Sequence, residues 1–416
     1  MSILIRGGKA LRGRVRCDGA KNAALPIMAG SILTDDAVEI GNVPFLLDVE
    51  TMVLVLRAIG VNAVYSGRSV KISSGRSLQT EAPYDLVRRM RASFLVMGPL
   101  LVRCKTASVP LPGGCAIGQR PVDLHLKGFH AMGADISVEH GFVTAKAKHL
   151  KGADIYLDMP SVGATENIMM AASLADGESI IENAAQEPEI VDLANFLNAM
   201  GADIRGAGTT RIRISGVKKL HGVQYNIIPD RIEAATYAIA VAMSKGKVTI
   251  ENVIPTHLRS VLAKIKECGA YLFEGPRSID IEMVQAPRST NIKTQPYPGF
   301  PTDVQAPYMA LCAISSGTSI ISETVFDNRF AHAEELGRMG AKIRIEGPNA
   351  IIEGVPRLAS AEVRATDLRA GAALVIAGMA AEGETQVNNL RYIDRGYDHL
   401  EDKLRSLGAD IQRVQL

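Results

Sequence analysis

Charged residues stand just before the most apolar segments of the chain, which we expect to be helices. A helix N-terminus presents unpaired N–H groups and partial positive charge, so it favours anions. For the acidic residues Asp230 and Asp367 we weigh simple helix capping and a functional role equally. Cations oppose the field of the helix, so an external anion explains Lys21, Arg91 and Arg369 better than capping does.

Two further arginines, Arg329 and Arg395, fall in loops after the following strands and would extend the same basic lining. The commoner fate of a single arginine is a solvated surface position. Five cations at equivalent positions of the repeat are not well explained as solvated surface charges. These residue types therefore indicate a site for a small polyanion. Asn22 and Asp303 stand at the same kind of junction.

The segment LPGGCAIGQRP, residues 111–121, departs from the rest of the chain because glycine and proline replace the usual strand-to-helix connection. We expect a mobile lid there. A thiol beside a cation favours the thiolate, so Cys115 near Arg120 is a candidate acid or nucleophile. The alternative is a small buried hydrophobe, which suits Cys312 better. We interpret all five cysteines as free thiols, with Cys17, Cys104 and Cys268 structural.

Metal and nucleotide motifs are missing from the sequence: it has no CxxC, HExxH, Walker A, GxSxG or GxGxxG after a strand. We therefore expect no metal and no cofactor. His125 falls near the predicted lid, and as a lone histidine opening a helix it is better explained as a hydrogen-bonding residue than as a metal ligand.

Composition sets the class of protein. With 416 residues, 47% hydrophobic, 22% charged and a formal charge of +2, the chain is long enough for two or three ordinary globular domains. Near-neutral charge and few aromatic residues argue against nucleic acid as a partner. No apolar run reaches the length of a membrane span and the start lacks a secretory signal, so we expect a cytoplasmic protein. Separately, we expect it to function as a monomer.

The elements that must position these residues come from a sixfold internal repeat. Each copy ends in a helix followed by a glycine, as in LNAMGADIRG, and these glycines stand at positions 60, 133, 201, 269, 340 and 408. An Ala-rich apolar segment running into a short strand also recurs, and its second copy is divergent. The pattern of each unit therefore predicts, in order, two strands, an apolar helix, a strand and an amphipathic helix.

The apolar helices constrain the architecture. GAALVIAGMAA is apolar on every side and must be buried, whereas YDHLEDKLRSLGA has a polar face. Helices inside strands invert the usual α/β barrel, and six units divide most simply into two globes of three. A solenoid is the alternative, but a period near 70 residues makes it the weaker one.

The chain resembles the enolpyruvyl transferase family from end to end. The segments that carry the resemblance are GAKNAALPI, APYDLVRRMRAS, LPGGCAIGQRPVDLH, SVGAT, ENAAQEPEIVD, PDRIEA, FPTDVQA, ETVFDNRF, ATDLRA and IDRGY. The resemblance implies two inside-out α/β barrel domains, each of three pseudo-symmetric βαβαββ-type units with buried helices and outer sheets. It implies domains of residues 21–228 and of 1–20 plus 229–416, with the active site in the cleft between them.

The implied activity is transfer of the enolpyruvyl group of phosphoenolpyruvate to the 3-hydroxyl of UDP-N-acetylglucosamine, the first committed step of peptidoglycan synthesis. The resemblance gives catalytic roles to Cys115, Asp303, Lys21 and Arg395. Phosphoenolpyruvate would be held by Lys21, Asn22, Arg120, Arg369 and Arg395. UDP-N-acetylglucosamine would be bound by Asn22, Arg91, Arg120, Pro121, Val122, Asp123, Leu124, Ser161, Val162, Gly163, Asp303 and Val325.

Three positions depart from the pattern of relatives. Leu47 and Met159 stand where some relatives have lysine, and Asp327 replaces a common glutamate. Two other functions stay open: transfer to shikimate 3-phosphate on the same scaffold, and a catalytically silent UDP-sugar-binding regulator. The lid cysteine argues against the first, and intact Cys115 and Asp303 argue against the second.

Overall fold

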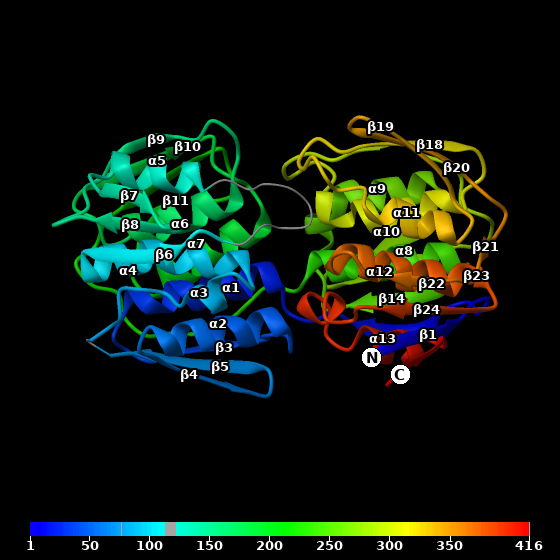
Figure 1. Ribbon diagram of the computed structural model, residues 1–416, viewed down its shortest axis with the longest axis horizontal. Helices are drawn as coiled ribbons and strands as arrows, with labels where there is room; N and C mark the ends of the chain where they lie inside the picture. Colours follow the sequence, from blue (N-terminus) through cyan, green and yellow to red (C-terminus); the bar gives the residue numbers. More distant parts are fainter. Residues whose placement is uncertain (76, 113–121, 416) are drawn as a thin grey trace. The chain divides into compact units, whose positions relative to one another are not determined.

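The computed structural model describes residues 1–75, 77–112 and 122–415. These residues form two compact units, coloured by sequence in Figure 1. The first unit comprises the described residues from 19 to 228, and the second comprises residues 1–18 and 229–415. Of the helices in these ranges, none combines the length and the apolar character that crossing a bilayer requires.

The first unit contains seven described α-helices: α1 (Lys21–Gly30), α2 (Leu47–Ala58), α3 (Tyr84–Val87), α4 (Met97–Cys104), α5 (Asp123–Ala131), α6 (Val162–Ala172) and α7 (Pro188–Ala199). Two 3-10 turns accompany them, η1 (Ser31–Leu33) and η2 (Arg91–Val96). Its described strands are β3 (Val38–Gly41), β4 (Val61–Ser66), β5 (Ser69–Ser74), β6 (Thr106–Pro110), β7 (Asp135–Glu139), β8 (Phe142–Lys146), β9 (Asp154–Tyr156), β10 (Glu178–Glu182), β11 (Asp203–Arg205), β12 (Arg211–Ser215) and β13 (Gln224–Asn226).

The second unit contains the described α-helices α8 (Arg231–Ser244), α9 (Arg259–Glu267), α10 (Gln305–Ala313), α11 (His332–Arg338), α12 (Leu368–Ala380) and α13 (Leu400–Ser406). Its 3-10 turns are η3 (Pro255–Leu258), η4 (Thr302–Val304) and η5 (Ile393–Arg395). Its strands are β1 (Ser2–Arg6), β2 (Arg12–Arg16), β14 (Lys247–Glu251), β15 (Tyr271–Glu274), β16 (Ser278–Glu282), β17 (Ile292–Lys293), β18 (Thr318–Ser322), β19 (Lys342–Glu346), β20 (Asn349–Glu353), β21 (Leu358–Ala359), β22 (Glu362–Arg364), β23 (Ala381–Glu382), β24 (Glu384–Asn388) and β25 (Asp410–Val414).

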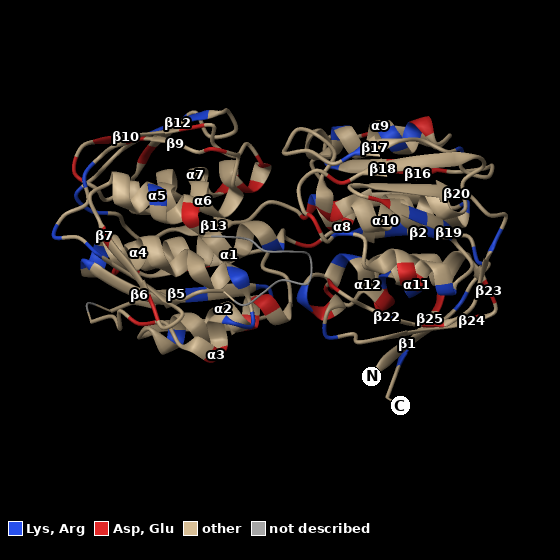
Figure 2. Cartoon of the chain, turned by 45° about the horizontal axis from the view of Figure 1, so that its top comes forward, with Lys and Arg blue, Asp and Glu red and all other residues tan. Residues whose placement is uncertain are grey.

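The apolar helices lie inside the units, as their composition requires. In the second unit α8, α10 and α12 pack against one another and are buried along almost their whole length. In the first unit α6 packs against both α1 and α4. These helices carry few charged residues, whereas charged residues are frequent on the outer strands, on loops and on more exposed helices such as α9 (Figure 2). The predicted α/β fold with buried helices and outer sheets is confirmed.

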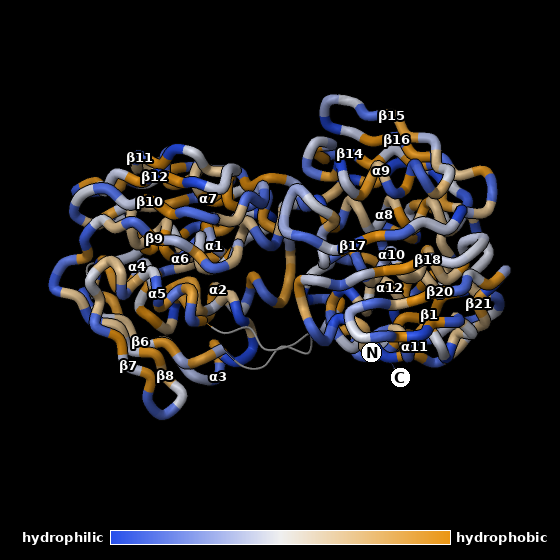
Figure 3. The backbone as a smooth tube through the Cα atoms, turned by 90° about the horizontal axis from the view of Figure 1, so that it is seen from above, coloured by the Kyte–Doolittle hydropathy of each residue, from blue (hydrophilic) through white to orange (hydrophobic). Residues whose placement is uncertain are grey.

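The outer sheets follow one recurrent topology. A four-stranded sheet combines three antiparallel strands with a fourth strand added in parallel at one edge, as in β13-β3-β5-β4 and β17-β18-β20-β19. The divergent second copy forms a three-stranded sheet, β6-β8-β7, extended by a single parallel bridge between Glu81 and Ser108. Buried and exposed residues alternate along strands such as β12, so one face packs on the helices (Figure 3).

The six repeat glycines all adopt the left-handed backbone conformation, with φ between +86° and +110°. Each lies just past a helix, and the N–H of Gly60 closes its turn on the carbonyl oxygen of Arg57. A residue with a Cβ pays about 1 kcal/mol or more in this conformation. The glycine of each repeat is therefore a structural requirement of the helix end and carries no chemistry.

Candidate active site

Asp303 is held between two buried arginines in the second unit. It lies in η4, directly before α10. Its Oδ1 accepts a hydrogen bond from Arg329 Nη2 at 2.9 Å, and its Oδ2 accepts one from Arg369 Nη2 at 3.0 Å. Arg329 is 4% exposed and Arg369 is 1% exposed. A buried guanidinium needs an anionic partner, so one carboxylate here serves two cations.

Each of the two arginines has one buried nitrogen that does not donate a hydrogen bond to any described residue. The Nη1 atoms of Arg329 and Arg369 are buried and have no hydrogen-bond partner among the described residues. Burial alone would lower the pKa of Arg369, but Tyr397, Asp303 and Asp230 raise it above its ordinary value, so the group stays charged. An unpaired buried donor costs free energy, which an anionic ligand would recover. The arrangement can therefore bind an anion beside the Asp303 carboxylate.

Asp303 differs from its two counterparts in the repeat. Asp230 caps α8 by accepting from the N–H groups of Ile232 and Glu233, and Asp367 caps α12 in the same way. The question left open by the sequence is thus answered in favour of capping for these two acids. Asp303 makes no side-chain cap, because α10 begins two residues later, with Val304 in the capping position. Its carboxylate is directed to the arginines instead.

Lys21 opens α1 in the first unit and has an internal partner. Its Nζ lies 3.2 Å from Asp48 Oδ2 in the first turn of α2, and both residues are less than 10% exposed. Asn22, the next residue of α1, is half-buried. Sequence reasoning missed Asp48, although this acid directly follows Leu47, a position that the sequence analysis had singled out.

Three segments predicted to bind the sugar nucleotide are joined through Asn167 of α6. Its amide nitrogen lies 3.1 Å from His125 Nδ1 and also donates to the carbonyl oxygen of Phe94. Burial, together with the charge of Arg91, lowers the pKa of His125 to about 3, so the ring is neutral. Because the amide donates to Nδ1, the proton sits on Nε2, beside Gly163. His125 is therefore the hydrogen-bonding residue that we expected.

Most of the other predicted binding residues lie at or near the starts of helices or turns. Val122, Asp123 and Leu124 lead into α5, and Ser161, Val162 and Gly163 lead into α6. Ser161 caps α6, since its hydroxyl accepts from Ala164 N at 3.4 Å. Of the remaining predicted residues, Arg91 is the first residue of η2, Arg395 is the last residue of η5, and Val325 lies three residues after the end of β18.

Residues 113–121 of the predicted lid lie outside the described residues, and with them Cys115, Arg120 and Pro121, so their roles stay predictions. The four cysteines that the structure describes are free thiols, as expected. Burial raises the pKa of the Cys17, Cys104 and Cys312 thiols, to about 12 for Cys312. These three thiols are poor nucleophiles at neutral pH.

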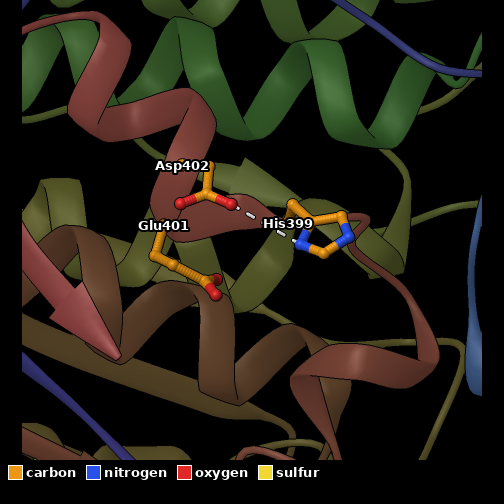
Figure 4. Close-up of side chains that lie close together, drawn as sticks. All are labelled: His399, Glu401 and Asp402. Atoms are coloured by element: carbon orange, nitrogen blue, oxygen red, sulfur yellow. Dashed lines mark ion pairs between the residues drawn. The ribbon is translucent and has the colours of Figure 1, made fainter. Parts of the chain in front are cut away.

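One group of histidine and acidic residues in the described part of the chain has ligand atoms close enough for a metal ion: His399, Glu401 and Asp402 (Figure 4). His399 Nδ1 lies 3.6 Å from Asp402 Oδ2. Glu401 is already paired with Arg413, and Asp402 with Arg405. Because both carboxylates have cationic partners, we assign no metal to this group.

Lys21, Arg91 and the starts of α5 and α6 belong to the first unit, whereas Asp303, Arg369 and Arg395 belong to the second. That the two sets meet around one substrate stays a prediction.

Comparisons with known proteins agree over nearly the whole chain. Residues 5–404 match the family of EPSP synthase (3-phosphoshikimate 1-carboxyvinyltransferase). The chain is 58% identical to UDP-N-acetylglucosamine 1-carboxyvinyltransferase 2 of Carboxydothermus hydrogenoformans, with 99% of both chains covered. It is 56% identical to UDP-N-acetylglucosamine 1-carboxyvinyltransferase 1 of Caldanaerobacter subterraneus subsp. tengcongensis, again with 99% of both covered.

Solved structures show the same fold. The enolpyruvyl transferase NikO of Streptomyces tendae superposes with a TM-score of 0.87 at 26% identity, over 99% of this chain and 98% of that one. EPSP synthase of Acinetobacter baumannii superposes with a TM-score of 0.76 at 21% identity over the whole of both chains. The second likeness concerns the fold alone.

Proposed function

The chain belongs to the EPSP synthase family of enolpyruvyl transferases, and on that premise we propose that it transfers the enolpyruvyl group of phosphoenolpyruvate to the 3-hydroxyl of UDP-N-acetylglucosamine, with release of phosphate. The observation that carries this proposal is the identity of 56 to 58% over 99% of two relatives named for that reaction. We further propose that it acts in the cytoplasm, in peptidoglycan synthesis, without a metal or cofactor.

The reaction is an addition followed by an elimination. The sugar hydroxyl loses its proton as its oxygen bonds to C2 of phosphoenolpyruvate, and C3 gains a proton to become a methyl group. The C2–O bond to phosphate then breaks while C3 loses a proton, which restores the double bond. The site must therefore supply one group that accepts a proton and one that donates it.

In this proposal the proton acceptor for the sugar hydroxyl is Asp303 and the proton donor to C3 is Cys115. Lys21, Asn22, Arg120, Arg369 and Arg395 hold the carboxylate and phosphate of phosphoenolpyruvate. Charge-assisted hydrogen bonds contribute about 1.5 to 3 kcal/mol each, so several cations suit a ligand with almost three negative charges.

The arginine pair explains how Asp303 acts as a base once substrate is bound. Two guanidiniums stabilise its carboxylate and so make it a weak proton acceptor in the free protein. When the phosphoenolpyruvate anion engages Arg369, part of that positive charge is shared with the ligand. Asp303 then gains basicity at the moment when a proton must be taken up.

Phosphate release tests the proposal. The protein is mixed with phosphoenolpyruvate and, in separate reactions, UDP-N-acetylglucosamine, shikimate 3-phosphate or no acceptor. Among these reactions, we expect continuous phosphate release only in the one that contains UDP-N-acetylglucosamine as the acceptor. Release with shikimate 3-phosphate instead would assign the competing transfer, and no release with any acceptor would favour a UDP-sugar-binding regulator.

A further inference from the structure

Glu323 is a buried carboxylate that contacts Thr302, the residue before Asp303, and no role in the proposed reaction uses it. It follows β18 and is 4% exposed. Its Oε1 accepts hydrogen bonds from Thr294 Oγ1 at 2.8 Å, from Val325 N at 2.9 Å and from Phe326 N at 3.2 Å. Its Oε2 accepts one from Thr302 Oγ1 at 2.9 Å. Four donors therefore stabilise one buried carboxylate.

These bonds join two turns that carry residues of the proposed site. Thr302 begins the turn that holds Asp303, and Val325 and Phe326 directly precede the turn of residues 327–331, which contains Arg329. The guanidinium carbon of Arg329 lies 5.4 Å from the centre of the Phe326 ring, and Arg329 in turn binds Asp303. Two chains of contacts therefore lead from Glu323 to Asp303. One passes through Thr302, the residue before Asp303, and the other passes through Phe326 and Arg329.

Thr294, which directly follows β17, connects Glu323 and its neighbours to the sheet. It is fully buried, its N–H donates to the Ser322 carbonyl oxygen, and its Oγ1 accepts from Thr324 N. The Thr324 hydroxyl donates to the Thr294 carbonyl oxygen at 2.6 Å. The backbone on either side of Glu323 is therefore held to β17 and its continuation, which gives the carboxylate a rigid base from which to orient the two turns.

We propose that Glu323 is a positioning residue for enolpyruvyl transfer, which sets the place of Asp303 and of the Val325 turn through Thr302 and the 325–326 N–H groups. This inference rests on the proposed function. Glu323 does not itself exchange a proton with substrate, because all four of its contacts are to groups of the protein that need an acceptor.

Two variants of Glu323 separate positioning from catalysis. Glu323→Ala removes every acceptor, and a displacement of the general base by about 1 Å is expected to lower kcat about 100-fold. Glu323→Gln keeps an oxygen for Thr294 and the two N–H groups, and the Thr302 hydroxyl can turn to accept from the amide. Glu323→Gln should therefore recover at least about tenfold of the lost kcat, with KM for both substrates within about threefold of wild type.

Glu401→Ala is the matched control, since Glu401 is an equally buried carboxylate of the same unit whose partner is Arg413. It should lower the stability of the unit without changing the kcat of the folded protein by more than about twofold. A Glu323→Gln variant as slow as Glu323→Ala would overturn the proposal, because loss of rate with retained geometry is the mark of a group that reacts.

Amide hydrogen exchange of the free protein gives a readout that does not depend on turnover. Glu323→Ala should speed exchange in residues 301–304 and 323–329, and Glu401→Ala should not. If wild type released no phosphate, the proposed function would fail while this measurement still decided the positioning. Should Glu323→Ala not fold, Thr302→Val takes its place: it must lower kcat and speed exchange in residues 301–304, and wild-type behaviour in both would overturn the inference.

Discussion

The wild-type protein should become less stable as pH rises through about 6, because the buried Asp192 carboxyl must then lose its proton. Replacing Asp192 by asparagine should remove this loss of stability. Asp192 lies on α7 and is 2% exposed. Its Oδ1 accepts from Tyr225 Oη at 2.6 Å, and its Oδ2 accepts from Ile228 N at 3.1 Å. Ile228 is the last residue of the first unit, so this carboxylate anchors the point where the chain leaves it.

The magnitude follows from the pKa. Burial, with a smaller contribution from Glu189, raises the pKa of Asp192 from 3.8 to about 6, against the lowering effect of its two hydrogen bonds. The folded state therefore holds a proton that the unfolded state has already lost. The stabilisation from this group is complete below about pH 4 and is lost as pH rises through about 6, and the full effect is about 3 kcal/mol.

Asparagine suits the site because its oxygen can accept from Ile228 N while its amide donates to Tyr225 Oη. The assay is urea unfolding of wild type and Asp192→Asn from pH 4 to 8, taking the difference at each pH so that all other groups cancel. The variant should gain about 3 kcal/mol on wild type between pH 4 and pH 7. A difference that stays flat, or that falls with pH, would refute the reasoning.

Tyr225→Phe provides the matched test of the cause. The Tyr225 hydrogen bond lowers the pKa of Asp192, so its removal should raise that pKa further. Stability of this variant should then continue to fall above pH 6, where the wild type has levelled off. An unchanged pH window would mean that the hydroxyl does not interact with the carboxylate.

Three other outcomes are expected. Asp303→Asn should lower kcat about 100- to 10,000-fold with little change in UDP-N-acetylglucosamine affinity, measured by turnover and calorimetry, and the reverse split would make Asp303 a binding residue only. Cys115→Ser should abolish both a phosphoenolpyruvate-derived mass adduct and sensitivity to thiol-directed epoxides such as fosfomycin; persistence of both would place the reactive thiol elsewhere. Asp48→Asn leaves the Lys21 ammonium buried without its ion pair, so the free energy of unfolding should fall by about 3 kcal/mol, and an unchanged urea midpoint would contradict this.

The fold was predictable because its main determinant is local. A segment such as residues 370–381 is apolar on every side, and α12, which spans most of it, is buried along nearly its whole length. The glycine after each second helix was likewise readable, since a fixed glycine past a helix end indicates a left-handed residue. All six adopt that conformation.

The partners of the charged residues were not predictable in the same way, because they depend on tertiary contacts. Asp303 and Arg369 are 66 residues apart, and Lys21 and Asp48 are 27 apart. No local pattern states which acid meets which base. Glu323 was missed for the same reason, since its four donors come from three separate stretches of chain.

The three equivalent acids of the second unit show how a small local change in one repeat can produce a candidate site. Asp230 and Asp367 satisfy the free N–H groups of their own helices, which is the ordinary use of an acid at that place. A short 3-10 turn delays the start of α10, so the third acid, Asp303, is released from capping. It is this displacement of one helix start that lets a carboxylate face Arg369.

The placement of Arg369 itself argues for function over stability. A cation in the first turn of a helix opposes the helix dipole by about 0.3 to 1 kcal/mol, and full burial adds a desolvation cost. Asp303 and Asp230 offset that cost, yet an apolar side chain would avoid it altogether. A charged residue kept against both penalties, with one buried donor unused among the described residues, is best explained by a ligand that completes the arrangement.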